Sequence, residues 1–271
     1  MVKTKTLLKW AFIALILLFI YFPIIFLTAY SFNANDHINE GWGGFSMAHY
    51  KYFFNFDNEP VRVVLQTFLL ALIVATLSTI LATIGSIGIY YSRKKMSGTL
   101  SAINRIPVIN AEVVTAISFA LFISFFGLDK STYIPLIVGQ MIICTPFVVL
   151  SIIPKLRQMD NNLYEAALDL GASPKRALFS VIIPQILPGI ISGFLLAITL
   201  SLDDYVVAAY TKPDSFTTIS THIYGLDKNN YFGAKIKAAY WAFTALIFFV
   251  ILLVVVIANV NAYRKNRSKK R

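Results

Sequence analysis

The sequence contains few charged residues and few of the side chains that catalysis and metal binding require. Only 14% of its 271 residues are charged, and it has one cysteine and three histidines. A single cysteine, Cys144, cannot form an intrachain disulfide, and we expect it to be a packing residue. The histidines, His37, His49 and His222, lie far apart, and we interpret each as a solvated loop residue. The sequence therefore predicts no catalytic residue and no metal site.

Apolar residues dominate instead, at 57% of the chain. Five runs without charge reach the roughly 20 residues that a bilayer-spanning helix needs, and a sixth run contains only one charged residue, Glu112. The sequence thus predicts an all-α integral membrane protein with six transmembrane helices. The six runs are residues 10–32, 63–92, 106–128, 131–154, 177–202 and 238–260.

The net charge of +11 could suggest nucleic-acid binding, but the positions of the basic residues are explained better by membrane topology. If the N-terminus is inside, 17 of the 24 lysine and arginine residues lie in cytoplasmic segments. The positive-inside rule then places both termini in the cytoplasm. The first apolar run is too long for a cleaved signal peptide, so we interpret it as an uncleaved first span. We expect a multi-pass protein of the cell membrane, surrounded by lipid, with no nucleic-acid partner.

The pattern of spans and loops predicts a single transmembrane domain over residues 1–271. It comprises the first span and an outer loop (1–60), a five-span core (61–260) that includes a cytoplasmic loop (155–180), and a basic cytoplasmic tail (261–271). Small side chains recur every third or fourth residue in two of the spans, which allows neighbouring helices to approach closely. These are Ala71, Ala75, Ser78, Ala82 and Gly85 in the second span, and Gly189, Gly193, Ala197 and Ser201 in the fifth.

A short charged segment interrupts the apolar sequence on the predicted cytoplasmic side. Residues 164–170 are good helix formers, and Leu163, Ala167 and Leu170 would share one face of a short amphipathic helix. Gly171 suits the left-handed position that ends such a helix. Ser173 as N-cap and Pro174 at the first helical position would begin a second helix that enters the fifth span. The prediction is a protruding elbow that a soluble protein could grip.

This segment resembles the motif of the permease subunits of binding-protein-dependent ABC importers. Glu165-Ala166-Ala167 is followed by Gly171 at the spacing of the motif. Residues 181–184 read VIIP where the family has Ile-x-Leu-Pro, which is a conservative departure in the apolar pair. Together with the six spans, the resemblance covers most of the chain and implies the fold of a type I importer permease.

The resemblance also implies partners and a role for the elbow. In this family the elbow is the coupling helix, seated on a separate ATP-hydrolysing subunit, so ATP and Mg²⁺ would bind that partner and this chain would need no cofactor. The implied partners are a homologous second permease subunit, a dimer of the ATPase and an extracytoplasmic substrate-binding protein. The residues implied in ATPase coupling are Glu165, Ala166, Ala167, Asp169 and Gly171.

Three acidic residues lie within or at the edge of the predicted spans. Glu112 is one to two turns into the third span, and Asp203 and Asp204 close the fifth. A carboxylate in hydrocarbon costs roughly 2.5 to 3.5 kcal/mol on insertion scales, so the presence of each of these acids in or near a span calls for a structural or functional explanation. Successive helical residues point about 100° apart, so we expect Asp203 and Asp204 not to face the same small ligand atom.

The spans contain no basic residue that could pair with these acids, so the sequence predicts an electronegative path for a cationic substrate. Tyr205 could add cation–π contacts to that path. The alternative interpretation is that Asp203 and Asp204 cap a loop in interfacial water.

The end of the fifth span is similar to one particular group of importer permeases. Residues 201–204 read SLDD and are followed by Val206 and Val207, a pattern similar to that of the second permease subunit of spermidine/putrescine importers. The resemblance implies a polyamine as cargo and a heterodimer of two permeases. Two alternatives stay open: an ABC importer permease for an inorganic ion, a phosphonate or a sugar, and a stand-alone carrier or channel.

Overall fold

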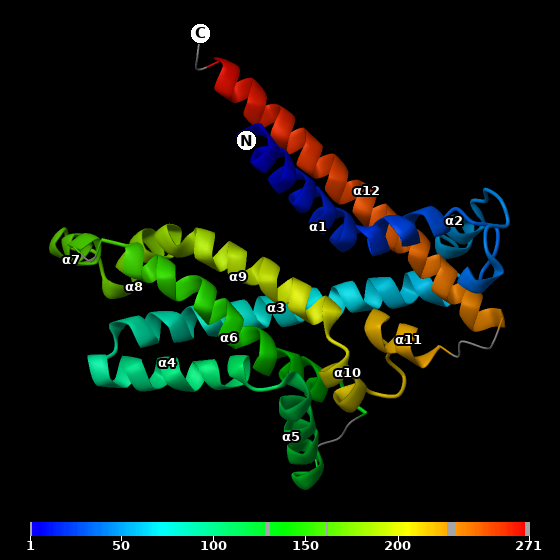
Figure 1. The fold of residues 1–271 in the computed structure, drawn as a ribbon. Coiled ribbons are helices and arrows are strands. Elements are labelled where there is room, and N and C mark those ends of the chain that lie inside the picture. The colour runs from blue at the N-terminus through cyan, green and yellow to red at the C-terminus, as the bar shows by residue number, and fades with distance from the viewer. Residues whose placement is uncertain (1, 128–130, 161, 227–230, 269–271) are drawn as a thin grey trace. The chain divides into compact units, whose positions relative to one another are not determined.

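The computed structural model describes residues 2–127, 131–160, 162–226 and 231–268, and within them nearly all of the ordered structure is helical (Figure 1). The β pairing in these ranges is one isolated antiparallel bridge between Asn33 and Phe45. Five helices are long and apolar enough to cross a membrane, and a bent helix pair could supply a sixth span. The predicted all-α membrane fold is therefore confirmed. The chain forms two compact units, Met1–Arg62 with Gly225–Arg271, and Val63–Tyr224.

The first unit consists of two long helices and an ordered loop. Helices α1 (Val2–Tyr30) and α2 (Ala48–Phe53) both contact α12 (Tyr231–Ser268). The loop between α1 and α2 contains a short 3₁₀ helix, η1 (Ile38–Glu40). The side chain of Asn33 stabilises this loop, because its amide donates to the Gly41 carbonyl at 2.8 Å and accepts from the Gly43 N–H at 2.7 Å.

The prediction that all three histidines are solvated is wrong for His49. This residue lies in α2 and is only 2% exposed, with Asp36 Oδ1 at 3.5 Å from its Nδ1 and the Trp241 ring at 6.2 Å. Its Nε2 has no hydrogen-bond partner among the described residues. His37 is half-buried, and His222 is half-buried within helix α11 (Ile219–Gly225).

Burial of His49 predicts acid sensitivity of the first unit. Burial lowers the pKa of His49, and Lys235 adds to that effect, whereas Asp36 opposes it. The unfolded chain therefore binds a proton more readily, so stability is present above about pH 6.5 and is lost as the pH falls below it. We expect the Tm of the detergent-solubilised protein to fall less between about pH 7 and pH 5 in His49→Gln than in the unaltered protein. His37→Gln is the control, and equal pH slopes in all three proteins would contradict the prediction.

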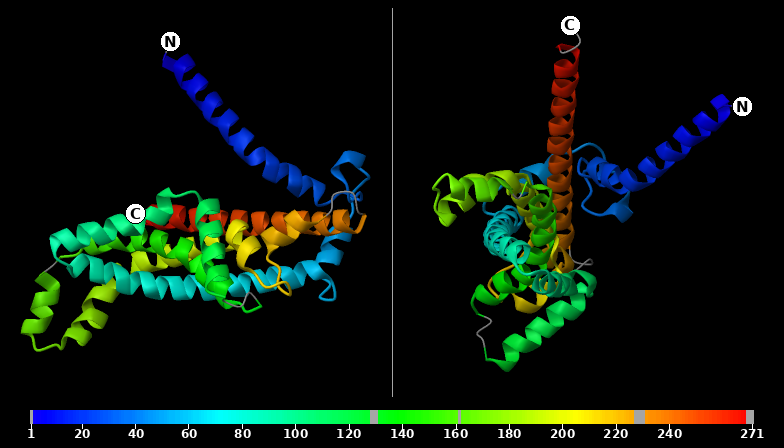
Figure 2. Two further views of the ribbon diagram at one scale, coloured as in Figure 1. Left: turned by 90° about the horizontal axis from the view of Figure 1, so that it is seen from below. Right: turned by 90° about the vertical axis from the view of Figure 1, so that its left-hand side faces the viewer.

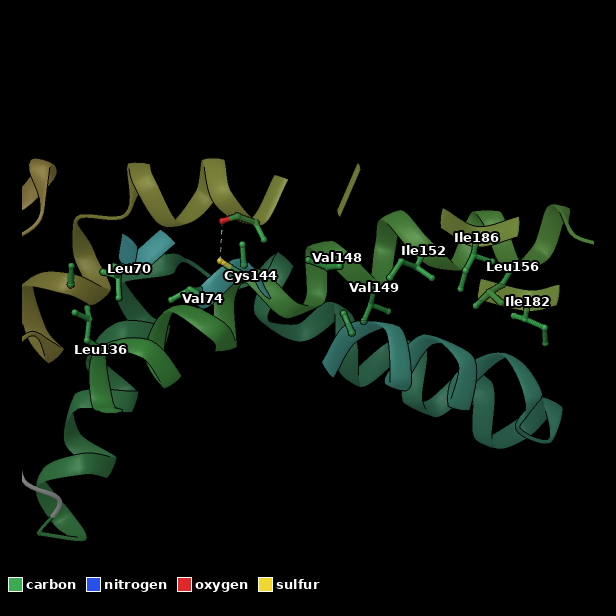
Figure 3. Close-up of a cluster of buried hydrophobic side chains, with 14 of the residues drawn as sticks. Leu70, Val74, Leu136, Cys144, Val148, Val149, Ile152, Leu156, Ile182 and Ile186 are labelled. Carbon is green, nitrogen blue, oxygen red and sulfur yellow. Dashed lines mark hydrogen bonds between the residues drawn. The ribbon is translucent and has the colours of Figure 1, made fainter. Parts of the chain in front are cut away.

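The second unit is built around the pair α6 (Ile134–Gln158) and α9 (Ile183–Asp203), which pack along their length. Figure 3 shows the buried side chains of α6 together with Ile182, Ile186 and two residues of α3 (Glu59–Tyr91), Leu70 and Val74. The small residues of the fifth span lie in this contact, as predicted. A Cβ atom added to Gly193 would lie 2.6 Å from Cγ1 of Val148, so α9 can approach α6 this closely only with glycine at that position.

Two further packing predictions hold in the second unit. Cys144 is buried and unpaired, and its Sγ lies 3.7 Å from the Ala197 carbonyl oxygen (Figure 3). Four of the five small residues of the second span are buried, as the stripe along that helix predicts. They are Ala71, Ala75, Ser78 and Ala82.

The predicted third span, residues 106–128, is not one continuous helix. The chain instead forms α4 (Lys94–Ile109) and α5 (Glu112–Phe125), bent by 102° at the two residues between them (Figure 1). Asn110 has an extended ψ of 147°, which ends α4 one turn after Pro107. The 14 residues of α5 extend only about 21 Å, which is shorter than the roughly 30 Å hydrocarbon core of a bilayer. The last residue of the predicted span, Leu128, lies outside the described residues.

Candidate functional site

A small polar cavity lies where α9 ends. The helix stops at Asp203, the backbone turns to an extended ψ of 116° at Asp204, and α10 (Val206–Thr211) follows. The cavity has a volume of about 70 Å³ and contains no lysine or arginine among the residues that line it. These are Glu112, Gln140, Ile143, Cys144, Leu200, Ser201, Asp203 and Asp204.

Three of the four predicted path residues line this one cavity. The sequence-based expectation that Asp203 and Asp204 diverge assumed a helix through both residues, but the helix ends between them, so both reach the same space. The bend between α4 and α5 makes Glu112 the first residue of α5 rather than a residue in the middle of a continuous helix. Tyr205 does not line the cavity, and its ring instead lies 4.3 Å from that of Tyr224.

Asp204 is held by several donors. It is 8% exposed, and its Oδ1 accepts the Val207 N–H while Oδ2 accepts the Ala208 N–H, both at 3.0 Å. Gln140 Nε2 donates to Oδ2 at 2.8 Å. Asp204 therefore caps α10, as the alternative interpretation of this residue expected, but it does so in a buried position that also borders the cavity.

Glu112 and Asp203 complete the acidic lining. The carboxyl groups of Glu112 and Asp204 lie in hydrogen-bonding contact with each other. Asp203 is exposed. The cavity thus combines the accessible carboxyl group of Asp203 with the close pair Glu112 and Asp204, an arrangement that suits an ammonium or another cation better than an anion.

Sequence reasoning missed the contribution of Gln140. It is the one amide side chain in the apolar run 131–154, and its Oε1 accepts from Ser201 Oγ at 2.7 Å. A lone amide inside an apolar helix needs a partner, because burying it unpaired costs free energy. That signal was present in the sequence, although the identity of the partners, more than 60 residues away, was not.

The predicted elbow lies at the opposite end of α9. Helix α7 (Asn162–Asp169) is followed by a turn in which Gly171 has a φ of +85°. The Gly171 N–H donates to the Leu168 carbonyl at 2.8 Å and the Ala172 N–H to that of Ala167 at 3.0 Å, which is the Schellman pattern. The predicted helix end is therefore confirmed.

The second arm of the elbow also begins as predicted. Ser173 Oγ accepts the Arg176 N–H at 3.4 Å and begins α8 (Pro174–Ala177). A π-helical segment, η2 (Leu178–Ile182), then joins α8 to α9. Figures 1 and 2 place the elbow at the end of the second unit away from α10. The helix–turn–helix prediction is thus confirmed, including its continuation into the fifth span.

The apolar face predicted for α7 is divided in the structure. Ala167 is half-buried beside Tyr164, whose ring lies 5.7 Å from that of Tyr91 at the end of α3. Leu163 and Leu170 are exposed, and Leu170 is 89% exposed. The elbow therefore presents an outward surface that contains apolar side chains together with Glu165 and Asp169.

Comparison with known proteins identifies the class. A family described as "Binding-protein-dependent transport system inner membrane component" matches residues 63–268, a region that contains both the cavity and the elbow. The chain belongs to this family, and it is a multi-pass inner-membrane protein. The resemblance inferred from the Glu-Ala-Ala segment is thereby confirmed.

Individual proteins of known name are also similar to this chain. The chain is 32% identical over 221 residues to the spermidine/putrescine transport system permease protein PotC of Haemophilus influenzae, covering 82% of this chain and 85% of that protein. It is 33% identical over 220 residues to the putrescine transport system permease protein PotI of Escherichia coli, covering 78% and 77%. Both relatives are transport permease subunits.

A solved structure supports the fold independently. The crystal structure of an amino acid ABC transporter with histidines is similar with a TM-score of 0.50 and 19% identity, over 77% of this chain and 95% of that chain. The likeness supports the arrangement of helices and carries no statement about the substrate.

Proposed function

We propose that this chain is a permease subunit of an ATP-driven polyamine importer and forms half of its translocation path. The acidic cavity carries the proposal, because Glu112, Asp203 and Asp204 meet around one space whose lining contains no basic residue. A polyamine offers ammonium groups that suit such a lining. The names of the relatives, which transport putrescine or spermidine, agree with this chemistry.

The proposed assembly has three kinds of partner. A homologous second permease would enclose the other half of the path, and an extracytoplasmic binding protein would deliver the cargo. A dimer of a separate ATPase would bind ATP and Mg²⁺. We assign both termini and the elbow to the cytoplasm, because the basic residues are concentrated in the segments on that side.

The elbow would transmit the movement of the ATPase. In this proposal Glu165, Ala166, Ala167, Asp169 and Gly171 form the part of α7 and its turn that the ATPase grips. Residues Pro174–Asp203 form one span that leads from the elbow to the cavity, so movement at one end reaches the other. Nucleotide binding would shift the bundle between inward-open and outward-open states, for which the cargo has different affinities.

Two alternatives make different predictions about cargo and partners. An importer for a phosphonate would place an anion beside three acidic side chains, which disfavours that cargo. Competition by phosphonate, sugar and inorganic ions against labelled putrescine in reconstituted vesicles separates these cargos. A stand-alone carrier or channel would transport without the ATPase and the binding protein, whereas the proposed importer would not.

Neutralising the accessible acid of the cavity tests the substrate assignment. We expect Asp203→Asn to reduce putrescine uptake by about three- to tenfold, because one exposed charge pair is worth about 1 kcal/mol. Copurification of the ATPase should not change, since Asp203 lies at the far end of α9 from the elbow. Asp214→Asn, which removes an exposed acid outside the cavity, is the control. Undiminished uptake by an Asp203→Asn/Asp204→Asn double variant would reject the role of these acids.

A further inference from the structure

Gln140 connects the two principal helices of the second unit at the cavity. It lies on α6, is 1% exposed, and both ends of its amide are used. Oε1 accepts from Ser201 Oγ at 2.7 Å, and Nε2 donates to Asp204 Oδ2 at 2.8 Å. Ser201 is the last of the small residues through which α9 packs against α6, so the close helix contact is what brings Gln140 within reach of both partners.

The chemistry of this position requires an amide. The Ser201 hydroxyl needs an acceptor, and the Asp204 carboxylate needs a donor, and a glutamine side chain supplies one of each. An ionised glutamate would bring a second negative charge against Asp204. A leucine would leave the Ser201 hydroxyl and the Asp204 carboxylate without this partner in a buried site, which is costly.

The contact with Gln140 limits what Asp204 can still bind. A carboxylate has about four acceptor positions, and Gln140, Val207 and Ala208 occupy three of those on Asp204. The remaining capacity is directed to the Glu112 carboxyl group, to which Asp204 is hydrogen-bonded. Asp204 is therefore a fixed group with room for about one further donor, rather than a mobile carboxylate that can adapt to its ligand.

We propose that Gln140 is a positioning residue for cargo recognition, which holds Asp204 so that one primary ammonium group can bind between Asp204 and Glu112. This inference rests on the proposed polyamine function. An ammonium group has three N–H donors, so it can donate to both the Asp204 and the Glu112 carboxyl groups from the cavity that they line. One ammonium group bound there offsets one of the two negative charges that the ionised carboxylates would carry.

The test is the kinetics of putrescine uptake by the complete importer in vesicles, with the ATPase and the binding protein present. We expect Gln140→Leu to raise the KM for putrescine by about tenfold, while the maximal rate changes less than about twofold. Gln140→Glu should show a KM that is near normal at about pH 5.5, where the introduced carboxyl group is protonated and can still donate, and that rises toward pH 8. The unaltered importer should not show this additional rise.

A matched control comes from the same helix. Thr145→Val removes a polar group from α6 whose buried hydroxyl has no hydrogen-bond partner among the described residues. It should leave both the KM and its pH profile unchanged. The amount of ATPase that copurifies with each variant reports whether the complex still assembles.

Two results would overturn the role of Gln140. The first is an unchanged KM in Gln140→Leu and at every pH in Gln140→Glu. The second is a loss confined to assembly or maximal rate, which would mean that the residue only stabilises the fold. Absence of putrescine uptake by the unaltered importer would instead contradict the proposed polyamine function, and the role of Gln140 with it. The measurement on the unaltered importer therefore distinguishes failure of the proposed function from failure of the Gln140 proposal alone.

Discussion

Replacing Glu112 with lysine is expected to reduce polyamine uptake by about 100-fold or more. The new ammonium group would lie beside Asp204, to which Glu112 is now hydrogen-bonded, and would act as a tethered copy of the cargo amine. A bound cation in this position would repel the cargo and remove the acid with which it should pair. Juxtaposed like charges cost several kcal/mol, and about 2.7 kcal/mol already corresponds to a 100-fold loss of affinity.

Two controls make the Glu112 prediction specific. Glu112→Gln keeps the size of the side chain and a hydrogen bond to Asp204, so we expect a loss of no more than about tenfold. Asp57→Lys reverses an exposed acid in the first unit and should leave uptake unchanged. The measurement is the initial rate of labelled putrescine uptake in vesicles. Uptake by Glu112→Lys at the unaltered rate, or an equal loss of ATPase copurification, would contradict this account of the cavity.

Replacing Leu170 with aspartate is expected to reduce both ATPase copurification and uptake by at least about 30-fold. Leu170 is 89% exposed at the tip of the elbow, although a leucine gains by burial, and the proposed ATPase contact would cover it. Burying an unpaired carboxylate in its place adds a desolvation cost to the lost apolar contact. About 2 kcal/mol corresponds to a 30-fold loss, and each of these two effects alone approaches that value.

The controls for Leu170 distinguish three possible causes of lost ATPase binding: a changed side-chain shape, an added charge and a folding defect. Leu170→Met keeps an apolar side chain of similar volume and should retain most binding. Asn162→Asp adds the same charge at the start of α7 and should have little effect. Because Leu170 does not support the fold from its exposed position, the Tm of the purified permease should not change. Full ATPase binding by Leu170→Asp would show that the elbow tip is not the contact surface.

Local sequence signals predicted the elbow and the packing face of the fifth span well. Gly171, Ser173 and Pro174 each impose a backbone conformation or a hydrogen bond within a few residues, so their effect can be read without knowing the fold. The small residues of the fifth span have the same property, because their spacing alone determines which side of the helix can approach a neighbour. These features were confirmed in the structure.

Features that depend on distant partners were predicted less well. The run 106–128 is mostly apolar, with Glu112 as its one charged residue, so its composition alone does not predict the 102° bend that makes Glu112 the start of a helix. His49 is buried by Asp36 and by Trp241, which lies nearly 200 residues away in the chain. The link from Gln140 to Ser201 and Asp204 requires α6 and α9 to be already packed together. The roles assigned to the elbow and cavity residues stay predictions, to be decided by the variants described above.

The link at Gln140 has a mechanical consequence for the span that joins elbow and cavity. The 30 residues Pro174–Asp203 measure about 45 Å, so a rotation of about 10° at one end would carry the other end through about 8 Å. A hydrogen bond of 2.8 Å would not survive such a displacement if α6 stayed in place. As long as the bond persists, α6 and α9 must move together as one rigid body. The hinges of the transport cycle must then lie outside this pair of helices.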